Sequence, residues 1–420
     1  MRFIIHRGAQ QVGGSCVEIN CEQSTIILDT GLPLDYSFGD DLSPNLPQPL
    51  FTDLNSGIKK LDGVFLSHAH LDHYGIAGLL PQGVPVYCGK ASAKLMKISG
   101  EMFSGRIPLP DLLTFLAKDK VKIGPFTVTP YLMDHSAFDS YGFLISAGGK
   151  NIFYSGDFRG HGRKSKIFDR FINNPPNDVD VLLMEGTLVG RKSSEPTMSE
   201  SGLEEKFVEV IRTTRGIVLV TTASQNIDRL VTLFRAAKRT NRMFIIDFYT
   251  AEILDQLKEH GRLPQASWPR IRVCYPQPLA KRFEELGLSE ILARHRKNGI
   301  RWTGINDIEV KAVMLIRPGF LRDIKRFLSL EGSSWVYSMW RGYFERSKPL
   351  RDLREYLEEK QVRIEYLHTS GHASLSDLKK MVDALNPETI VPIHSFHPEE
   401  YKNHFPYVRQ LEDGEVFEIT

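Results

Sequence analysis

Residues 65–75 read FLSHAHLDHYG, and the other expectations for this chain are built around this stretch. It places His68, His70, Asp72 and His73 within six positions, directly after the apolar run DGVFLS. Imidazole nitrogens and carboxylate oxygens are good ligands for zinc or manganese, and a tight turn can aim several of them at one or two ions. Only 13 of the 420 residues are histidine, so this spacing favours a metal site over an ordinary polar loop.

Three more ligand-type residues follow apolar runs further along the chain. They are His135 in YLMDHSAF, Asp157 in IFYSGDFRG and His394 in IVPIHSF. A single histidine at the end of a strand is more often structural or solvated than a ligand. Together with the HxHxDH stretch, however, these residues favour one shared site, because loops at strand ends commonly carry function on an α/β scaffold.

The order of apolar runs predicts an α/β protein. Short β-branched and aromatic runs, broken by Gly, Pro and Asp, indicate strands over much of residues 15–157. Strands then alternate with helices: the run 217–223 precedes a helical pattern over 225–240, and 242–248 precedes one over 250–260. This alternation is typical of a parallel sheet. The net charge of +2 neither requires nor excludes a nucleic-acid partner.

The HxHxDH spacing and the downstream ligand-type residues resemble the metallo-β-lactamase superfamily, an αββα sandwich with a two-metal site along one edge. The resemblance divides the ligands into two triads and a bridge: His68, His70 and His135 for one ion, Asp72, His73 and His394 for the other, and Asp157 between them. It also implies that Asp29, in IILDTG, supports the ligands from behind. Zinc is the first expectation for the two divalent ions and manganese the second. Such a site generates a hydroxide at neutral pH and stabilises charge on a phosphoryl or acyl centre.

The stretch between Asp157 and His394 is far longer than a compact small-molecule hydrolase needs. It resembles the β-CASP nucleases of the ribonuclease J type in VLLMEGT, which contains Glu185, in TTASQNIDRL and in HTSGHASL, which contains His372. The implied organisation is a metallo-β-lactamase domain over 1–190, an inserted α/β β-CASP domain over 191–350 that covers the metal edge, and the rest of the sandwich over 351–420.

The resemblance points to catalytic roles for Asp72, His372 and Glu185. A protonated His372 can bind the scissile phosphate or donate a proton to the leaving oxygen, and Glu185 can orient that ring and raise its pKa. Ser370, and Arg159 in the basic stretch DFRGHGRKSK, are expected to contact substrate phosphate. Glu185 has an ordinary alternative as a strand-end carboxylate that is bound to a backbone amide. The basic stretch with Arg159 has an ordinary alternative as a solvated surface.

These expectations together describe a metal-dependent hydrolase of RNA phosphodiester bonds, with single-stranded RNA as its partner. A DNA nuclease of the same family and a small-molecule hydrolase of thioesters or lactones stay open, as do exo or endo cleavage and a monomer or a homodimer. His394 favours RNA, because DNA-directed members typically carry an aliphatic residue there. No apolar run reaches the roughly 20 residues that span a bilayer, and the four cysteines form no CxxC pair, so we expect a cytoplasmic protein with free thiols.

Overall fold

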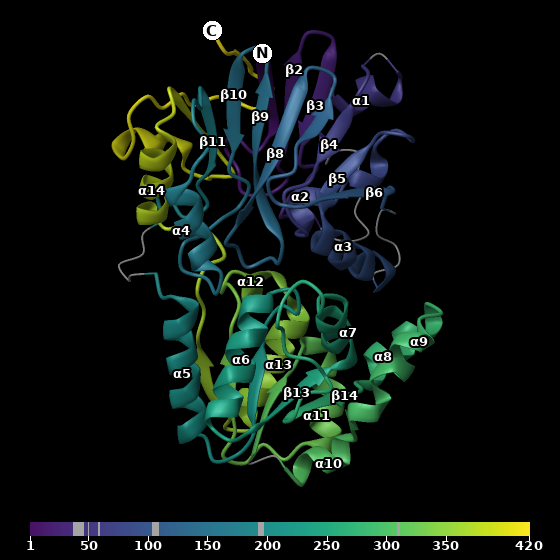
Figure 1. The fold of residues 1–420 in the computed structure, drawn as a ribbon. Helices are drawn as coiled ribbons and strands as arrows, with labels where there is room; N and C mark the ends of the chain where they lie inside the picture. Colours follow the sequence, from purple (N-terminus) through teal and green to yellow (C-terminus); the bar gives the residue numbers. More distant parts are fainter. Residues whose placement is uncertain (37–45, 49, 58, 103–108, 192–196, 309–310) are drawn as a thin grey trace. The chain divides into compact units, whose positions relative to one another are not determined.

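The chain folds into two compact units in a computed structural model that describes all residues except 37–45, 49, 58, 103–108, 192–196 and 309–310 (Figure 1). The first unit consists of Met1–Pro196 and Gly371–Thr420, and the second of Thr197–Ser370. No helix in the described ranges has the length and apolar character needed to cross a membrane. The expected α/β class, with one sandwich and one inserted α/β unit, is confirmed.

Two sheets form the first unit. One has the strand order β20 (Val416–Glu418), β1 (Arg2–Arg7), β2 (Cys16–Cys21), β3 (Ser24–Leu28), β4 (Gly63–Phe65), β5 (Val86–Gly89) and β6 (Leu112–Phe115). The other has the order β19 (Thr389–Ile393), β11 (Val181–Glu185), β10 (Lys150–Tyr154), β9 (Ser140–Ala147), β8 (Phe126–Met133) and β7 (Val121–Ile123). Pairing is antiparallel among β1, β2 and β3 and among β7 to β10, and parallel from β3 to β6 and along β10, β11 and β19.

Side chains alternate between the two faces of the second of these sheets, and this alternation builds an αββα sandwich. On β11, Val181 and Leu183 belong to a core shared with Phe3 and Phe65 of the facing sheet. Their neighbour Leu182 faces the other way, into a core that includes Phe168. That outer core is covered by α4 (Ser165–Asn173) and α14 (Leu375–Leu385), while α1 (Leu50–Asn55), α2 (Leu71–Tyr74) and α3 (Lys90–Met102) accompany the first sheet.

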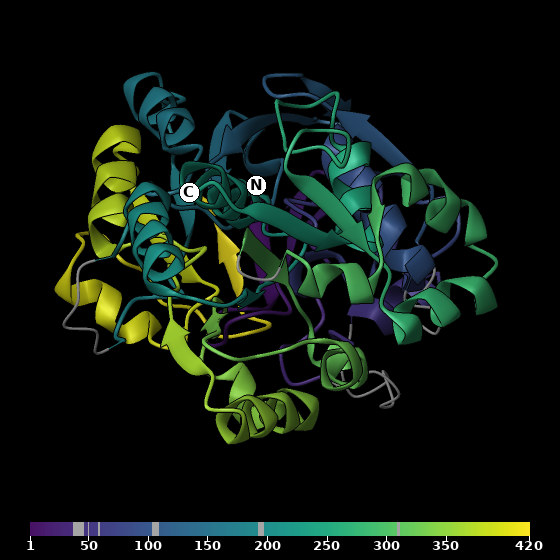
Figure 2. The ribbon, with the colours of Figure 1, turned by 90° about the horizontal axis from the view of Figure 1, so that it is seen from below.

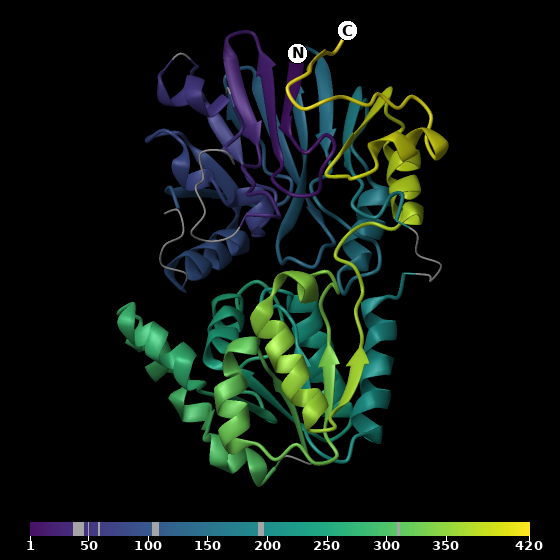
Figure 3. The same cartoon turned by 180° about the vertical axis from the view of Figure 1, so that it is seen from behind.

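The second unit is built on one seven-stranded sheet in which every pairing is parallel. Its order is β15 (Gly299–Ile300), β14 (Ile271–Cys274), β13 (Met243–Asp247), β16 (Ala312–Leu315), β12 (Val218–Thr221), β17 (Ser334–Tyr337) and β18 (Arg363–Tyr366). Helices flank both faces of this sheet (Figures 1, 2 and 3). The helices of this unit are α5 (Glu200–Thr213), α6 (Ile227–Arg239), α7 (Phe248–Gln256), α8 (Gln277–Glu285), α9 (Ser289–His295), α10 (Trp302–Asn306), α11 (Leu321–Phe327), α12 (Tyr343–Arg346) and α13 (Lys348–Glu359).

The second unit ends later than the expected boundary at residue 350. The stretch 351–370 carries most of α13 and the strand β18, and β18 pairs in parallel with β17. Leu353 and Leu357 of α13 are buried in the core of the same unit. Strand pairing and packing therefore assign 351–370 to the inserted unit, and the return to the sandwich comes at Gly371. The expectation that this unit covers the metal edge stays a prediction.

Candidate metal centre

The expected metal ligands of the first unit lie at the carboxyl ends of its strands, in loops or in the short helix α2. The HxHxDH stretch follows β4 and runs into α2, His135 follows β8, Asp157 follows β10 and His394 follows β19. Asp29 and Glu185 also stand at strand ends, after β3 and at the end of β11. Since the strands are hydrophobic and buried, they hold these short loops rigidly at one edge of the sandwich.

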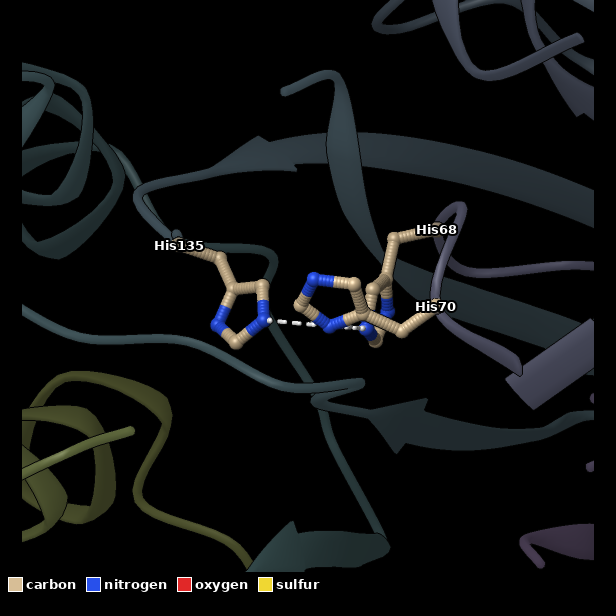
Figure 4. A group of neighbouring side chains, drawn as sticks. All are labelled: His68, His70 and His135. Carbon is tan, nitrogen blue, oxygen red and sulfur yellow. Dashed lines mark hydrogen bonds between the residues drawn. The ribbon is translucent and has the colours of Figure 1, made fainter. Parts of the chain in front are cut away.

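Three imidazole rings, those of His68, His70 and His135, meet with nitrogen atoms facing one another (Figure 4). The Nδ1 atom of His70 lies 3.1 Å from His68 Nε2 and 3.3 Å from His135 Nε2. Two nitrogens bound tetrahedrally to one zinc ion at 2.0–2.1 Å stand about 3.3 Å apart. The spacing of these rings therefore fits ligation of a single ion.

A second group of ligand atoms comes from Asp72, His73 and His394. The Nε2 atoms of His73 and His394 lie 3.9 Å and 3.5 Å from Asp72 Oδ2. Asp157 stands between this group and the three rings: its Oδ2 is 3.2 Å from His73 Nε2 and 3.9 Å from His68 Nε2. The structure thus brings all seven expected ligands together, with Asp157 in contact with both groups.

Buried polar atoms without hydrogen bonds support a metal at this position. Both carboxylate oxygens of Asp157, His73 Nε2 and His394 Nε2 are buried and make no well-directed hydrogen bond among the described residues, even though His73 Nε2 lies 3.2 Å from Asp157 Oδ2. A buried polar atom without a partner costs about 1–3 kcal/mol, and more when it is charged. Bound cations would satisfy these lone pairs, so the residues present fit divalent metal ions.

Asp29 holds two parts of the site in place from behind the ligands. Its fully buried carboxylate accepts hydrogen bonds from the Ser67 backbone N–H at 2.7 Å, the Ser67 hydroxyl at 2.8 Å and the Tyr154 hydroxyl at 2.5 Å. It also contacts His73 Nδ1 at 2.8 Å, so the opposite nitrogen of that ring faces Asp157. Such contacts fix the orientation and tautomer of a ligating ring.

Two further supports were not expected from the sequence. The backbone oxygen of Gly371 lies 2.6 Å from His135 Nδ1, and the Thr187 hydroxyl lies 2.9 Å from His394 Nδ1. His394 itself has a left-handed backbone with φ of 50°, an uncommon state for a residue other than glycine. Thr187 follows the expected Glu185 by two positions, but nothing in its local sequence pairs it with a histidine so far along the chain.

Burial favours the neutral form of the three rings in the first group. Burial lowers the pKa of His68, His70 and His135, and neighbouring imidazoles lower the pKa of His68 further. A neutral imidazole keeps a lone pair for a cation. This electrostatic environment favours ligation over protonation.

The second group favours positive charge instead. Burial opposes charge on His73, but Asp157 and Asp29 outweigh it and raise the pKa of that ring. Burial likewise opposes ionisation of Asp157 and Asp72, yet nearby imidazoles hold the pKa of each carboxyl below its usual value. The ionised carboxylates favour a nearby positive charge, and either a proton on His73 or a bound divalent cation can supply it.

His372 and Glu185 stand beside the ligand cluster. His372 Nδ1 lies 3.5 Å from Glu185 Oε1 and 3.5 Å from Asp157 Oδ2. Burial opposes charge on His372, but the two carboxylates outweigh it and raise the pKa of the ring. Asp157, His372 and His394 also offer ligand atoms close enough for one ion, so His372 has a second potential role as a ligand.

Glu185 also accepts hydrogen bonds from backbone amides, as expected for a structural carboxylate at the end of a strand. The carboxylate accepts hydrogen bonds from the backbone N–H groups of Thr187 and Ala373 at 3.0 Å each, and from that of Phe158 at 3.5 Å. These bonds fix the Oε1 atom that faces His372. Glu185 therefore combines a local structural function with a position that orients the ring.

Arg159 is placed differently from the expectation that it contacts substrate. Its side chain is fully buried, and its Nε lies 3.8 Å from Asp134 Oδ1. The backbone N–H of Arg159 donates to the Asp134 carbonyl at 2.6 Å. Tertiary packing thus turns this arginine inward, where it supports the loop after Asp157. Ser370 is half-buried and is the last residue of the second unit, and its substrate contact stays a prediction.

Two family models match parts of the chain. Residues 25–222 match the beta-lactamase superfamily domain, and residues 351–398 match the Zn-dependent metallo-hydrolase RNA specificity domain. The first match includes the HxHxDH stretch and Asp157, and the second includes His372 and His394. The two models therefore cover the expected metal ligands from both parts of the first unit.

Curated relatives extend the similarity along most of the chain. Ribonuclease J from Helicobacter pylori (strain ATCC 700392 / 26695) is 23% identical over 413 residues, which is 92% of this chain and 55% of that protein. The chain thus spans about half the length of such relatives. The protein called Probable RNase MJ4, from Methanocaldococcus jannaschii, is 23% identical over 414 residues, with 94% of this chain and 93% of that protein covered.

A solved structure shares the fold over nearly the full length. It is a protein of unknown function from Enterococcus faecalis V583, with a TM-score of 0.77, 20% identity and 99% of each chain covered. At that identity the likeness concerns the fold alone. The sandwich, the clustered ligand-type residues, the two family models and the relatives all support the resemblance of this chain to the metallo-β-lactamase superfamily and, within it, to the β-CASP nucleases of the ribonuclease J type.

Proposed function

We propose that this protein is a metal-dependent ribonuclease that hydrolyses phosphodiester bonds of single-stranded RNA at two bound divalent ions. One observation carries the proposal: seven ligand-type side chains converge at one edge of the sandwich, with His372 and Glu185 directly beside them. The match to a domain model described by RNA specificity, over residues 351–398, supports RNA as the substrate. The relatives named as ribonucleases support the same class of reaction.

The ligands divide between two ions in this proposal. His68, His70 and His135 would hold one, Asp72, His73 and His394 would hold the other, and Asp157 would serve both, with zinc as the first choice and manganese as the second. Two such ions, when bound, lower the pKa of water and polarise a phosphoryl oxygen. The protein contributes a rigid, partly buried arrangement of ligands, in which Asp29 keeps His73 in orientation.

His372 acts on the substrate phosphate. Its ring contacts both Asp157 and Glu185, and these carboxylates favour the protonated form of the ring. A protonated imidazole can donate a hydrogen bond to a non-bridging phosphate oxygen, or a proton to the leaving oxygen. Glu185, fixed by backbone N–H groups, orients this ring.

The test is incubation of purified protein with end-labelled RNA and with DNA of the same sequence, each with and without a chelator. We expect cleavage of the RNA that chelation abolishes and that added zinc or manganese restores. His70→Ala, which removes a central member of the first ligand group, should abolish metal-dependent cleavage. Cleavage confined to DNA, or hydrolysis of a thioester or lactone without cleavage of RNA, would refute the proposal.

A further inference from the structure

An exposed aromatic pair lies at the carboxyl edge of the sheet in the second unit. Trp340 follows β17, and Tyr343 begins α12. Their side chains are 41% and 44% exposed, and their ring centroids lie 5.6 Å apart with the planes at 85°. Large aromatic side chains are normally buried to a high degree, so a contacting pair at the surface indicates a binding role.

The pair stands on a rigid base. Tyr337, which is 1% exposed, donates a hydrogen bond from its hydroxyl to the backbone oxygen of Trp340 at 3.1 Å. The ring of Tyr337 also packs against that of Phe344, with centroids 4.2 Å apart. A surface held in place before binding loses little conformational entropy when a ligand arrives.

Gly342 allows the indole to lie across the chain. A Cβ atom at this position would overlap the six-membered part of the Trp340 ring. The φ angle of Gly342 is −58°, which any residue adopts, so backbone conformation does not explain the glycine. The absence of a side chain there instead makes room for the observed position of the indole.

Two arginines add positive charge to this surface. The guanidinium carbon of Arg341 lies 4.0 Å from the centroid of the Tyr366 ring, and that of Arg346 lies 5.9 Å from the Trp340 ring. Both arginines are exposed. Cations placed over aromatic rings at these distances are attracted to the ring faces. The surface therefore combines aromatic rings with positive charge.

We propose that Trp340 and Tyr343 form a stacking platform for the bases of single-stranded RNA, with Arg341 contacting the phosphate backbone. The inference rests on the proposed ribonuclease function and adds how the inserted unit recognises its substrate. Bases of a single strand can stack on aromatic side chains, whereas those of a duplex are already stacked on one another. Because every base has a π-face, the platform accepts many sequences and selects for single strands.

Equilibrium binding tests the platform without reading hydrolysis. The metal-loaded protein is titrated into three labelled ligands with a hydrolysis-resistant phosphorothioate backbone: single-stranded RNA, its duplex and an abasic strand of equal length. Trp340→Ala should weaken binding of the single strand by roughly 5- to 150-fold, the range expected for losing one stacked base. The abasic strand keeps its charge and loses its bases, so its affinity should change by less than about twofold.

Matched variants separate stacking from charge and from folding. Trp340→Phe should keep most of the affinity, since it keeps a ring. Gly342→Ala displaces the indole without removing it and should weaken binding of the single strand, with an unchanged circular dichroism spectrum. Arg341→Gln should reduce the slope of log affinity against log salt concentration by the amount expected for one lost phosphate contact, whereas Trp340→Ala should leave this slope unchanged. Tyr407→Ala, which removes a ring that is 74% exposed in the first unit, should leave affinity unchanged.

Equal affinities of folded wild type and Trp340→Ala for the single strand would overturn the platform, and the pair would then belong to a protein-binding surface. An equal loss for the abasic strand would overturn stacking as the mechanism. The outcomes are distinct from those for the proposed function. A protein that cleaves RNA but binds it independently of Trp340 contradicts only the platform, and one that binds through Trp340 without cleaving contradicts only the ribonuclease.

Discussion

Replacing His372 with alanine should separate the proposed catalytic role of this ring from metal binding at the site. The ring stands 3.5 Å from both Glu185 and Asp157, but it is outside the seven residues to which we assign the metals. After its removal, the Glu185 carboxylate still accepts hydrogen bonds from the backbone N–H groups of Thr187 and Ala373, so it keeps hydrogen-bond donors. We therefore expect His372→Ala to keep its fold and its metal content.

The size of the expected effect follows from the role of the ring. A positioned general acid, or a donor to the phosphate, contributes about 10²- to 10⁴-fold to the rate. This range corresponds to roughly 3–5 kcal/mol of activation free energy. His372→Ala should lower kcat/KM for RNA by that factor. Glu185→Gln should have a smaller effect, because it changes the orientation of the ring without removing it.

The assay pairs metal content, measured by plasma mass spectrometry, with cleavage of one RNA substrate. His70→Ala is the control for metal loss, and His404→Ala, which replaces a half-buried histidine outside the cluster, is the control for loss of any imidazole. A His372→Ala protein that cleaves at nearly the wild-type rate would refute the assignment. If it loses an ion, then His372 is a metal ligand. In that case His372 either replaces His394 as a ligand or binds the metal together with it.

Three further predictions concern the same unit. The fully loaded protein should contain about two ions per chain by metal analysis, and saturation at one would contradict the division of ligands. Asp29→Asn should lower metal affinity about 10- to 100-fold in competition with a chromophoric chelator, because the amide no longer fixes the His73 tautomer; unchanged affinity would argue against this support. Glu18 is buried, which opposes ionisation, but contacts with His6 and Lys59 outweigh burial and lower its pKa to about 2. Because the pKa in the folded state is the lower one, this stabilisation is complete above about pH 4.5 and is lost as the pH falls towards 2. Glu18→Gln should therefore lower the free energy of unfolding by up to about 3 kcal/mol near neutral pH, with the difference disappearing in acid, and a pH-independent difference would contradict this origin.

The chemistry of the candidate metal centre follows from short stretches of sequence. Expected ligands such as His68, His70 and Asp72 are neighbours in the chain, so their spacing alone predicts convergence. His135, Asp157 and His394 each follow a β-branched run, and strand-end loops of one sandwich edge gather side chains that are far apart in sequence. The apolar periodicity that predicts strands and helices is likewise local, which is why the α/β class and its alternation were predictable.

Burial, strand pairing and the extent of the units depend on contacts between residues that are far apart in sequence. Arg159 belongs to a basic stretch, yet packing against Asp134 turns it inward, and no local pattern distinguishes a buried arginine from an exposed one. Thr187 contacts a histidine more than 200 positions away, so only folding brings the two together. The return to the sandwich at Gly371 depends on β18 pairing with β17, and strand pairing is a choice among non-local partners that hydrophobic periodicity does not encode.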